Sequence, residues 1–362
     1  MNENKPLKIS SYYQNKITIV SFVLVIMMLY VHGIYNEAEQ FRMSFVVKSI
    51  ISRLSYRVIN PTYFTISGFL FFYGLNAMTD CFPKMKKRLR TVLIPFVLWN
   101  VIVVLESLFF SHNPFTKEFF NFNLLDKYHS LSTGLYNLLI CPAGFHLWFL
   151  RDLIVYIAIS PIIFRLIKKC SWYVPVILLV LTPPLMQAFN LGHLDIAFFT
   201  LGGTIAIKSE LQSVRTFLSK PIVAASAAIY LGLSFTWDFF LPNHFRGEEY
   251  LSILFSACGM ITVWRGYDSL SHITNLENNH LLQTFTNYSF FIYLFHEPVL
   301  FVIMQLGTSL LGVNSRSLSF LYIINPILVI ILAIIVAKTI KTIVPSLYSV
   351  LTGGRITRFQ SR

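Results

Sequence analysis

The chain contains few charged residues for its length. Of its 362 residues only 12% are Asp, Glu, Lys or Arg, whereas soluble domains carry roughly 25%. This density is too low to cover the surface of ordinary soluble domains. A hydrophobic share of 55% excludes a disordered chain, and four cysteines are too few for a disulfide-rich secreted module. The composition indicates a protein whose main solvent is lipid.

The sequence contains ten apolar stretches, some of them short, that are candidates for crossing a bilayer. A span needs roughly 20 mainly apolar residues in a helix. The expected spans are Ile17–Ile34, Tyr63–Ala77, Val92–Phe110, Leu147–Ile163, Trp172–Phe189, Ile196–Ile207, Ile222–Leu241, Leu251–Val263, Tyr288–Leu306 and Ser319–Ala337. We therefore expect an all-α polytopic membrane protein of about ten transmembrane helices, organised as a single transmembrane domain over residues 1–362.

Acidic residues are scarcer than basic ones, 16 against 29, which gives a net charge of +13. With the N-terminus inside, 20 of the Lys and Arg residues fall on the cytoplasmic side, 8 fall outside and Arg151 lies within a span. This asymmetry predicts cytoplasmic termini and a cell (inner or plasma) membrane protein. The excess charge then faces the inner leaflet, so no nucleic-acid partner is expected.

The ends and connections of the expected spans add three expectations. No small-x-small cleavage site follows the first span, which favours an uncleaved anchor. Residues 35–62 show the periodicity of a helix lying on the membrane surface, and residues 111–146 form a mixed outer loop. Only Cys141 is expected outside, so no disulfide pair is expected.

Polar residues within apolar spans are candidates for function, because a charge at the bilayer centre costs at least about 2.5–3.5 kcal/mol. His32 closes the first span, where an imidazole serves as a general base or proton shuttle. An interfacial histidine at a helix end is the alternative. Trp148, Arg151 and Asp152 lie at i, i+3 and i+4, on one helix face. A structural ion pair beside an interfacial tryptophan explains them equally well.

Tyr293, His296 and Glu297 repeat this spacing within the ninth span. A carboxylate beside an imidazole at that depth needs a partner or a water-filled cavity. A structural contact between helices is the alternative interpretation.

A basic cluster precedes the third span. Its members are Lys84, Lys86, Lys87, Arg88 and Arg90. Such a cluster is typical of a cytoplasmic membrane surface in contact with lipid headgroups. It also suits a phosphate-rich cytosolic ligand, since arginine forks match pyrophosphate.

Together these features resemble the acyltransferase-3 family of integral membrane acyltransferases. The matching segments are, in order, Val31–His32, Phe64–Leu70, Arg88–Arg90 with Ile94–Phe96 and Trp99, His146–Leu153, Phe199–Gly202 and Ser289–Pro298. They cover nearly the whole chain, and ten spans with cytoplasmic termini fit the family.

The resemblance implies an enzyme that takes an acyl group, usually acetyl, from cytosolic acyl-CoA. The acyl group would pass to a hydroxyl of an extracytoplasmic or lipid-linked glycan. His32 corresponds to the catalytic histidine of the family, which would act as a general base or as an acyl relay, and Arg88 and Arg90, with Lys87, correspond to its donor-binding motif. Residues expected to contact substrate or support the site are Ser67, Trp148, Arg151, Asp152, Tyr293, His296 and Glu297. No metal is expected, because no HExxH or clustered carboxylate pattern occurs.

The sequence departs from the family at Ser21. Family members commonly have an arginine eleven positions before the histidine, and Ser21 occupies that position here. Eleven residues span about 16 Å of helix, a distance that resembles the reach of a pantetheine arm. Either the donor site is rearranged around Arg88, Arg90 and neighbouring lysines, or the acyl-CoA chemistry is weakened or lost.

Two other functions use the same features. A transporter or flippase for a lipid-linked glycan would need the same cavity and ion pairs without a covalent step, and Ser21 mildly favours it. Against it, matching broken helices in two halves are not evident in the sequence. A non-enzymatic subunit that recruits a synthase would be expected to carry bulkier loops or a soluble domain.

Overall fold

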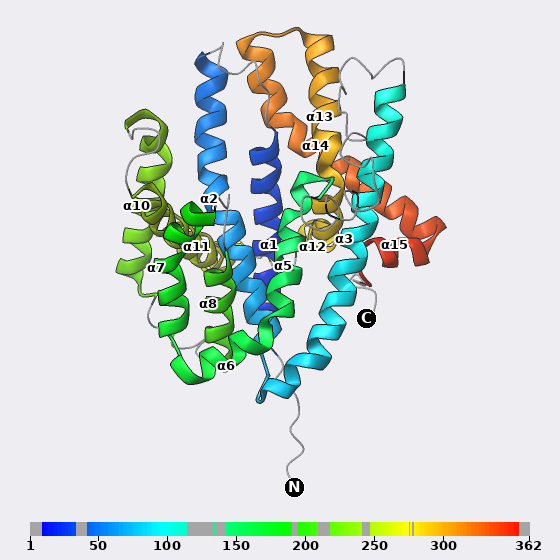
Figure 1. The fold of residues 1–362 in the computed structure, drawn as a ribbon. Coiled ribbons are helices and arrows are strands. Elements are labelled where there is room, and N and C mark those ends of the chain that lie inside the picture. The colour runs from blue at the N-terminus through cyan, green and yellow to red at the C-terminus, as the bar shows by residue number, and fades with distance from the viewer. Residues whose placement is uncertain are drawn as a thin grey trace. The chain divides into compact units, whose positions relative to one another are not determined.

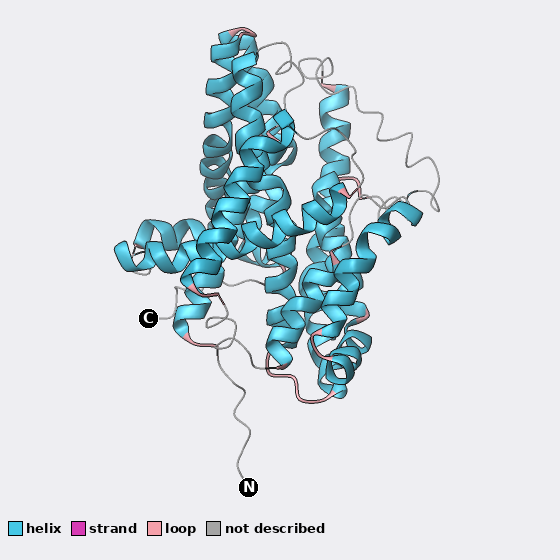
Figure 2. Ribbon diagram, turned by 90° about the vertical axis from the view of Figure 1, so that its left-hand side faces the viewer, coloured by secondary structure: helices cyan, strands magenta, loops and turns pink. Residues whose placement is uncertain are grey.

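Helices make up the regular secondary structure throughout the described part of the chain (Figures 1 and 2). The computed structural model describes residues 9–33, 42–113, 142–189, 195–208, 218–240, 247–274 and 279–354, and single residues 134, 136 and 276. Within a bilayer a helix satisfies its own backbone N–H and C=O groups, whereas an open strand does not. The expected all-α fold is confirmed.

A helix covers most of the described residues of each expected span, although α2 ends at Phe72 and leaves the last five residues of the span Tyr63–Ala77 outside it. The long helices are α1 (Ser11–His32), α2 (Arg42–Phe72), α3 (Cys81–His112), α7 (Tyr173–Phe189), α8 (Ile196–Ile207), α10 (Lys220–Phe240), α11 (Glu248–Ile273), α13 (Ser289–Leu311) and α14 (Ser315–Ile343). The fourth expected span is instead two helices, α5 (Trp148–Ala158) and α6 (Ser160–Cys170). The short helices are η2 (Met78–Asp80), η4 (Phe145–Leu147), α12 (His280–Asn287) and α15 (Pro345–Leu351).

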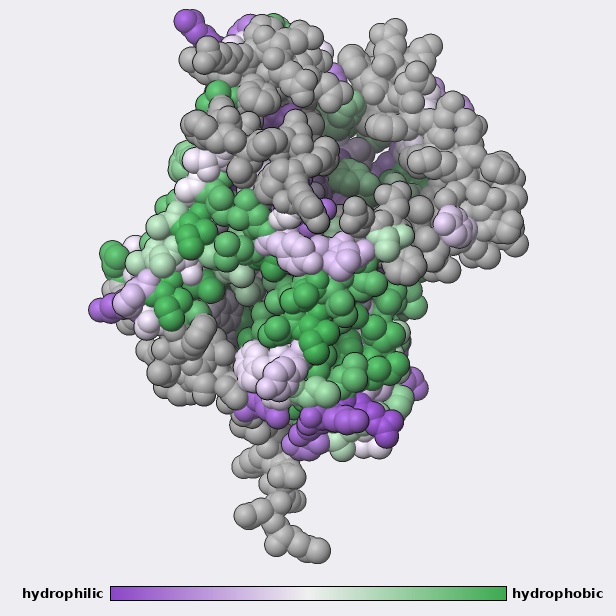
Figure 3. All heavy atoms as spheres, turned by 60° about the vertical axis from the view of Figure 1, so that its left-hand side comes forward, coloured by the Kyte–Doolittle hydropathy of each residue, from purple (hydrophilic) through white to green (hydrophobic). Residues whose placement is uncertain are grey.

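Several helices have the length and apolarity needed to cross a membrane. Within the described residues four qualify, or up to five if the α5–α6 pair is one span. The face drawn in Figure 3 has broad hydrophobic areas bordered by hydrophilic side chains. These features agree with a membrane protein, while ten spans and cytoplasmic termini stay predictions.

The expected surface helix at residues 35–62 is part of a longer element. The helix α2 runs without interruption from Arg42 into the second expected span, so a separate surface helix is wrong. The charge of Arg57 is accommodated by an ion pair of 3.3 Å with Glu248, a hydrogen bond to Ser252 and the ring of Trp237 at 4.6 Å. These partners allow the helix to continue through a charged position.

Part of the expected topology falls outside the described residues. This applies to most of the outer loop at residues 111–146, including Cys141, and to residues 34–41. Among the cysteines within the described residues, Cys81, Cys170 and Cys258 carry free thiols.

The chain divides into two compact units, each assembled from separate segments. The first unit comprises Met1–Val31, Phe45–Lys84 and Ile159–Thr286, and the second comprises His32–Ser44, Met85–Ala158 and Asn287–Arg362. In the first unit α10 packs against α11, and α8 packs against α6 and α7. In the second unit α13 packs against α14, as Figure 1 also shows, and η4 contacts α13.

Close backbone contact between α2 and α8 explains two of the segments that resemble the family. A Cβ atom on Gly68 would overlap the carbonyl of Phe199, and one on Gly202 would overlap the carbonyl of Thr65. Glycine is needed at both positions because the two helices leave no room for a side chain. The two segments therefore meet each other within the first unit.

We expect Gly202→Ala to destabilise the protein by about 1–3 kcal/mol, because the added methyl group forces two backbones apart. Gly232→Ala in α10 is the matched control, since a Cβ there would meet no atom within 4 Å. It should be neutral or stabilising by about 0.5–1 kcal/mol. Thermal unfolding in detergent measures both variants, and equal transition temperatures would contradict the contact.

A buried charge cluster joins α1 to α11 in the first unit. The ammonium group of Lys16, 2% exposed, lies 2.5 Å from Asp268 Oδ1 and 4.2 Å from the ring centre of Trp264. Arg265 and Tyr12 also contact the Asp268 carboxylate, at 2.6 and 2.5 Å. Burial alone would raise the pKa of Asp268, but the hydrogen bonds from Lys16 and Tyr12 and the nearby positive charges lower it overall.

The C-terminal helix α15 packs against α3 in the second unit. The indole N–H of Trp99 donates to the carbonyl of Leu351 at 3.2 Å. Gly353, with φ +66°, approaches the carbonyl of Thr91 so closely that a Cβ would overlap it. This turn therefore lies directly beside the end of the Arg88–Arg90 segment.

Candidate active site

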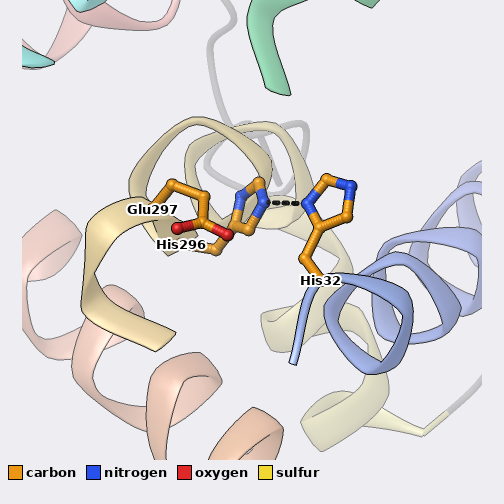
Figure 4. A group of neighbouring side chains, drawn as sticks. All are labelled: His32, His296 and Glu297. Atoms are coloured by element: carbon orange, nitrogen blue, oxygen red, sulfur yellow. Dashed lines mark hydrogen bonds between the residues drawn. The ribbon is translucent and has the colours of Figure 1, made fainter. Parts of the chain in front are cut away.

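His32 and His296 meet in the second unit. His32 is the last residue of α1, and His296 lies within α13 and is fully buried. His32 Nδ1 lies 2.8 Å from His296 Nε2, and the ring centres are 5.0 Å apart (Figure 4). Two residues separated by 264 positions in sequence thus form one hydrogen-bonded pair.

The partners of these rings determine where the hydrogen atoms lie. His296 Nδ1 is 2.6 Å from the carbonyl oxygen of Tyr293. A carbonyl only accepts, so His296 Nδ1 carries the hydrogen and, in the neutral ring, His296 Nε2 is the acceptor. His32 Nδ1 must then donate, which leaves His32 Nε2 with its lone pair. Figure 4 shows this second nitrogen of His32 directed away from His296.

Glu297 adds a carboxylate beside the two rings. The ligand atoms of His32, His296 and Glu297 lie within 4.8 Å of one another, and these donor types bind zinc. Two nitrogens on one tetrahedral zinc would stand roughly 3.3 Å apart, given Zn–N distances of about 2.0–2.1 Å. The observed 2.8 Å between His32 and His296 is the distance of a hydrogen bond. The geometry therefore fits a shared proton better than a bound ion.

The helix α13 is interrupted at this point. Glu297 has non-helical angles of φ −103° and ψ 134° and is followed by Pro298. Since proline has no N–H, the carbonyl of Leu294 loses its helical donor. The interruption thus places polar backbone next to the histidine pair.

His146 is a third imidazole at this site, and the sequence did not single it out. Its ring is 1% exposed and packs edge-on against His296, with ring centres 4.8 Å apart. Phe145 lies against His32 at 5.1 Å. The motif containing His146 was noted for Trp148, Arg151 and Asp152, because the histidine precedes the expected span. Only the fold reveals its contact with α13.

Tyr293 links α13 to the segment that carries His146. Its hydroxyl donates to the carbonyl of His146 at 2.8 Å, while its own carbonyl binds His296. In addition, the buried Asn100 of α3 accepts the N–H of Ala143 at 2.7 Å. The first bond holds η4 beside α13, and the second holds the residues just before η4 beside α3.

The other residues of the second unit that the sequence indicates for the site are Trp148, Arg151 and Asp152, on α5. Arg151 and Asp152 form an ion pair with each other at 2.7 Å, as in the structural interpretation of this motif. Trp148 packs against Phe149, whose ring lies 6.2 Å from that of Tyr293. The aromatic residues therefore extend from α5 to the histidine site.

The basic motif lies near the start of α3. Lys87 and Arg90 are exposed and Arg88 is half-buried. Exposed cations at a helix surface are available to a phosphate ligand.

Ser21 and Ser67 belong to the first unit. Ser67, on α2, is half-buried beside Gly68 at the contact with α8. The carbonyl of Ser21 accepts the hydroxyl of Tyr63 at 2.5 Å. The bond at Ser21 therefore joins α1 to α2 through the backbone, and Ser67 lies where α2 meets α8.

Comparison with known proteins agrees with these features. Residues 16–342 match the acyltransferase-3 family, described as an acyltransferase domain. The chain is 24% identical over 359 residues to the succinoglycan biosynthesis protein ExoH of Rhizobium meliloti (strain 1021), covering 94% of this chain and 92% of that protein. No solved structure matches the chain. Because the family match extends over most of its length, this chain belongs to the acyltransferase-3 family and is an acyltransferase.

Proposed function

We propose that the protein is a membrane O-acyltransferase that moves an acyl group, with acetyl as the first candidate, from cytosolic acyl-CoA to a glycan hydroxyl. The glycan would be extracytoplasmic or lipid-linked, and the enzyme would reside in the cell (inner or plasma) membrane. The relative ExoH is named for succinoglycan biosynthesis, which supports a polysaccharide acceptor.

The observation that carries this proposal is the hydrogen-bond order from Tyr293 through His296 to His32. The Tyr293 carbonyl fixes the hydrogen of His296, and His296 in turn fixes that of His32. The remaining lone pair on His32 Nε2 is the group that a general base needs. The arrangement resembles the orienting role of the third group in a catalytic triad.

The transfer step follows from this arrangement. His32 Nε2 takes the proton of the acceptor hydroxyl while the hydroxyl oxygen bonds to the thioester carbonyl carbon. The carbonyl electron pair moves onto oxygen and returns as the C–S bond breaks. The CoA thiolate then leaves with the proton that His32 holds. The nearby Glu297 carboxylate, when ionised, would stabilise the transient imidazolium.

Other residues would position the two substrates. Arg88, Arg90 and Lys87 would bind the phosphates of acyl-CoA, which compensates for Ser21 at the usual arginine position. Trp148 and Tyr293 would line the acceptor side. Trp148 packs against Phe149, whose ring lies near that of Tyr293, and the Tyr293 hydroxyl holds η4 beside the histidines. The membrane lipids would surround the helices, and no metal takes part in the proposed step.

The test uses purified protein in liposomes with acetyl-CoA labelled in the acetyl group. A crude polysaccharide extract serves as acceptor, and succinyl-CoA is compared as a second donor. We expect label in an alkali-labile ester on the polysaccharide. If the protein neither binds nor transfers any short acyl-CoA, the proposal is overturned and a glycan transporter is favoured.

For the donor site, Arg88→Gln should raise the KM for acyl-CoA by about 10- to 100-fold, because a charge-assisted hydrogen bond contributes about 1.5–3 kcal/mol. The kcat should change little if the arginine binds phosphate distant from the reacting carbon. Lys169→Gln is the control, since Lys169 is an exposed cation of α6 outside the motif. Equal KM values for Arg88→Gln and wild type would locate the donor site elsewhere.

A further inference from the structure

His146 is a buried imidazole that the step above leaves unused. It is 1% exposed, and within the described part of the chain neither Nδ1 nor Nε2 has a hydrogen-bond partner. The carbonyl oxygen of Leu294 lies near the ring, but its distance and angle are not those of a hydrogen bond. The ring packs 4.8 Å from that of His296 and 6.1 Å from that of Tyr293. His146 therefore lies beside the base pair with its polar atoms unsatisfied.

The backbone around His146 is, by contrast, firmly held. Tyr293 donates to its carbonyl, and Asn100 accepts from Ala143 three residues earlier. A Cβ on Gly144 would come within 2.9 Å of His146 Cε1, so a larger residue would push against the ring. The fold thus specifies where the imidazole lies without satisfying it.

An unsatisfied buried ring has an energetic consequence. Burying a polar group without a partner costs free energy, and phenylalanine would fill similar space without that cost. A position that served packing alone would be better occupied by an apolar ring. The Leu294 carbonyl, which has no helical donor, lies near the ring but without the geometry of a hydrogen bond, so the ring N–H remains available to a partner that arrives with the substrate.

The proposed reaction creates one group that needs a donor. As the acceptor oxygen bonds to the thioester carbon, negative charge develops on the carbonyl oxygen. The hydrogens of His32 Nδ1, His296 Nδ1 and the Tyr293 hydroxyl are already engaged in bonds. A neutral imidazole always carries one N–H, and in His146 this hydrogen is not used in a hydrogen bond.

We infer that His146 is a catalytic residue that donates its ring N–H to the thioester carbonyl oxygen as that oxygen becomes an oxyanion. The inference rests on the proposed acyl transfer. His146 keeps its proton throughout: the oxyanion accepts a hydrogen bond, and its electron pair returns to carbon when the C–S bond breaks. His32 alone carries the proton from the acceptor hydroxyl to the thiolate.

The test compares His146→Phe and His146→Gln with wild type in liposomes supplied with labelled acetyl-CoA and polysaccharide extract. His146→Phe should lower kcat by about 10²- to 10³-fold, the usual cost of one oxyanion donor, with little change in the KM for acetyl-CoA. Its unfolding temperature should equal or exceed that of wild type, because an unsatisfied polar group is removed. His146→Gln retains an N–H donor and should recover part of kcat. The control His280→Phe replaces an exposed histidine of α12 and should leave kcat unchanged.

Wild-type kcat in His146→Phe would overturn the inference. The inference would also be overturned if His146→Phe unfolds at a lower temperature and its kcat falls only in proportion to the fraction of protein that is folded. In that case the role of His146 is packing. If His146→Phe does not fold, His146→Leu is compared with His146→Gln, and equal kcat values in that pair overturn the inference. Failure of wild type to transfer acetyl is a different result, because it removes the proposed function before any His146 variant is measured.

Discussion

Acyl transfer is expected to fall by about 10²- to 10⁴-fold in kcat when His32 is replaced by glutamine, the usual contribution of a general base. The side-chain amide of glutamine still forms hydrogen bonds but does not take a proton from a hydroxyl near neutral pH. The KM for acyl-CoA should stay close to that of wild type, because the phosphates are proposed to bind at Arg88 and Arg90. Initial rates with labelled acetyl-CoA measure both constants.

Two comparisons make this expectation specific. His280→Gln alters an exposed histidine at the start of α12 and should retain full activity. His296→Leu removes the acceptor for His32 Nδ1–H, so the ring is free to adopt the other tautomer and kcat should fall by less than in His32→Gln. Undiminished kcat in His32→Gln would exclude His32 as the base.

Removing the carboxylate at Asp268 should destabilise the protein by about 3–5 kcal/mol, since the buried ammonium of Lys16 loses the carboxylate oxygen that lies 2.5 Å from it. We expect this loss in Asp268→Ala, measured as the free energy of unfolding in mixed SDS micelles. The double variant Lys16→Met, Asp268→Leu should recover most of the loss, because it removes both charges together. A double variant as unstable as the single one would contradict this account.

The same cluster predicts how stability depends on pH. Burial of Asp268 acts to raise its pKa in the folded protein, but Lys16, Tyr12 and Arg265 lower this pKa by more, so that it lies below its usual value. The contribution of the ionised Asp268 to the free energy of unfolding is therefore complete above the unfolded pKa of about 3.9 and is lost as pH falls through the lower folded pKa. Asp268→Ala should lack this part of the acid transition.

The helical class was predictable because hydrophobic runs of span length leave few alternatives in lipid. The boundaries of α8 agree with the expected span at both ends. The break between α5 and α6 was missed, although the sequence carries a signal for it: Pro161 lies in the first turn of α6, where its missing N–H breaks no helical hydrogen bond. Likewise, the charges of α2 suggested a surface helix until Glu248 and Trp237 were seen to contact Arg57.

The candidate site was predictable where a polar residue interrupts an apolar run. His32, His296 and Glu297 were found by that signal, and the structure brings them together. His146 was missed because it lies before the apolar run, where a histidine is unremarkable. The glycine contacts of Gly68 and Gly202 were also hidden, since a sequence does not show which helices approach closely.

The pairing of His32 with His296 also has a consequence for biosynthesis. His32 is synthesised with α1, whereas its partner His296 on α13 lies 264 residues further along the chain and is synthesised later. A nascent chain that stops before α13 therefore contains the proposed base without the group that orients it. Activity should arise only once α13 has inserted, and a chain truncated after Thr274 should regain it only when the segment from Asn279 onward is co-expressed. In the proposed acyl transfer, the oriented base would therefore form only after α13 has been inserted.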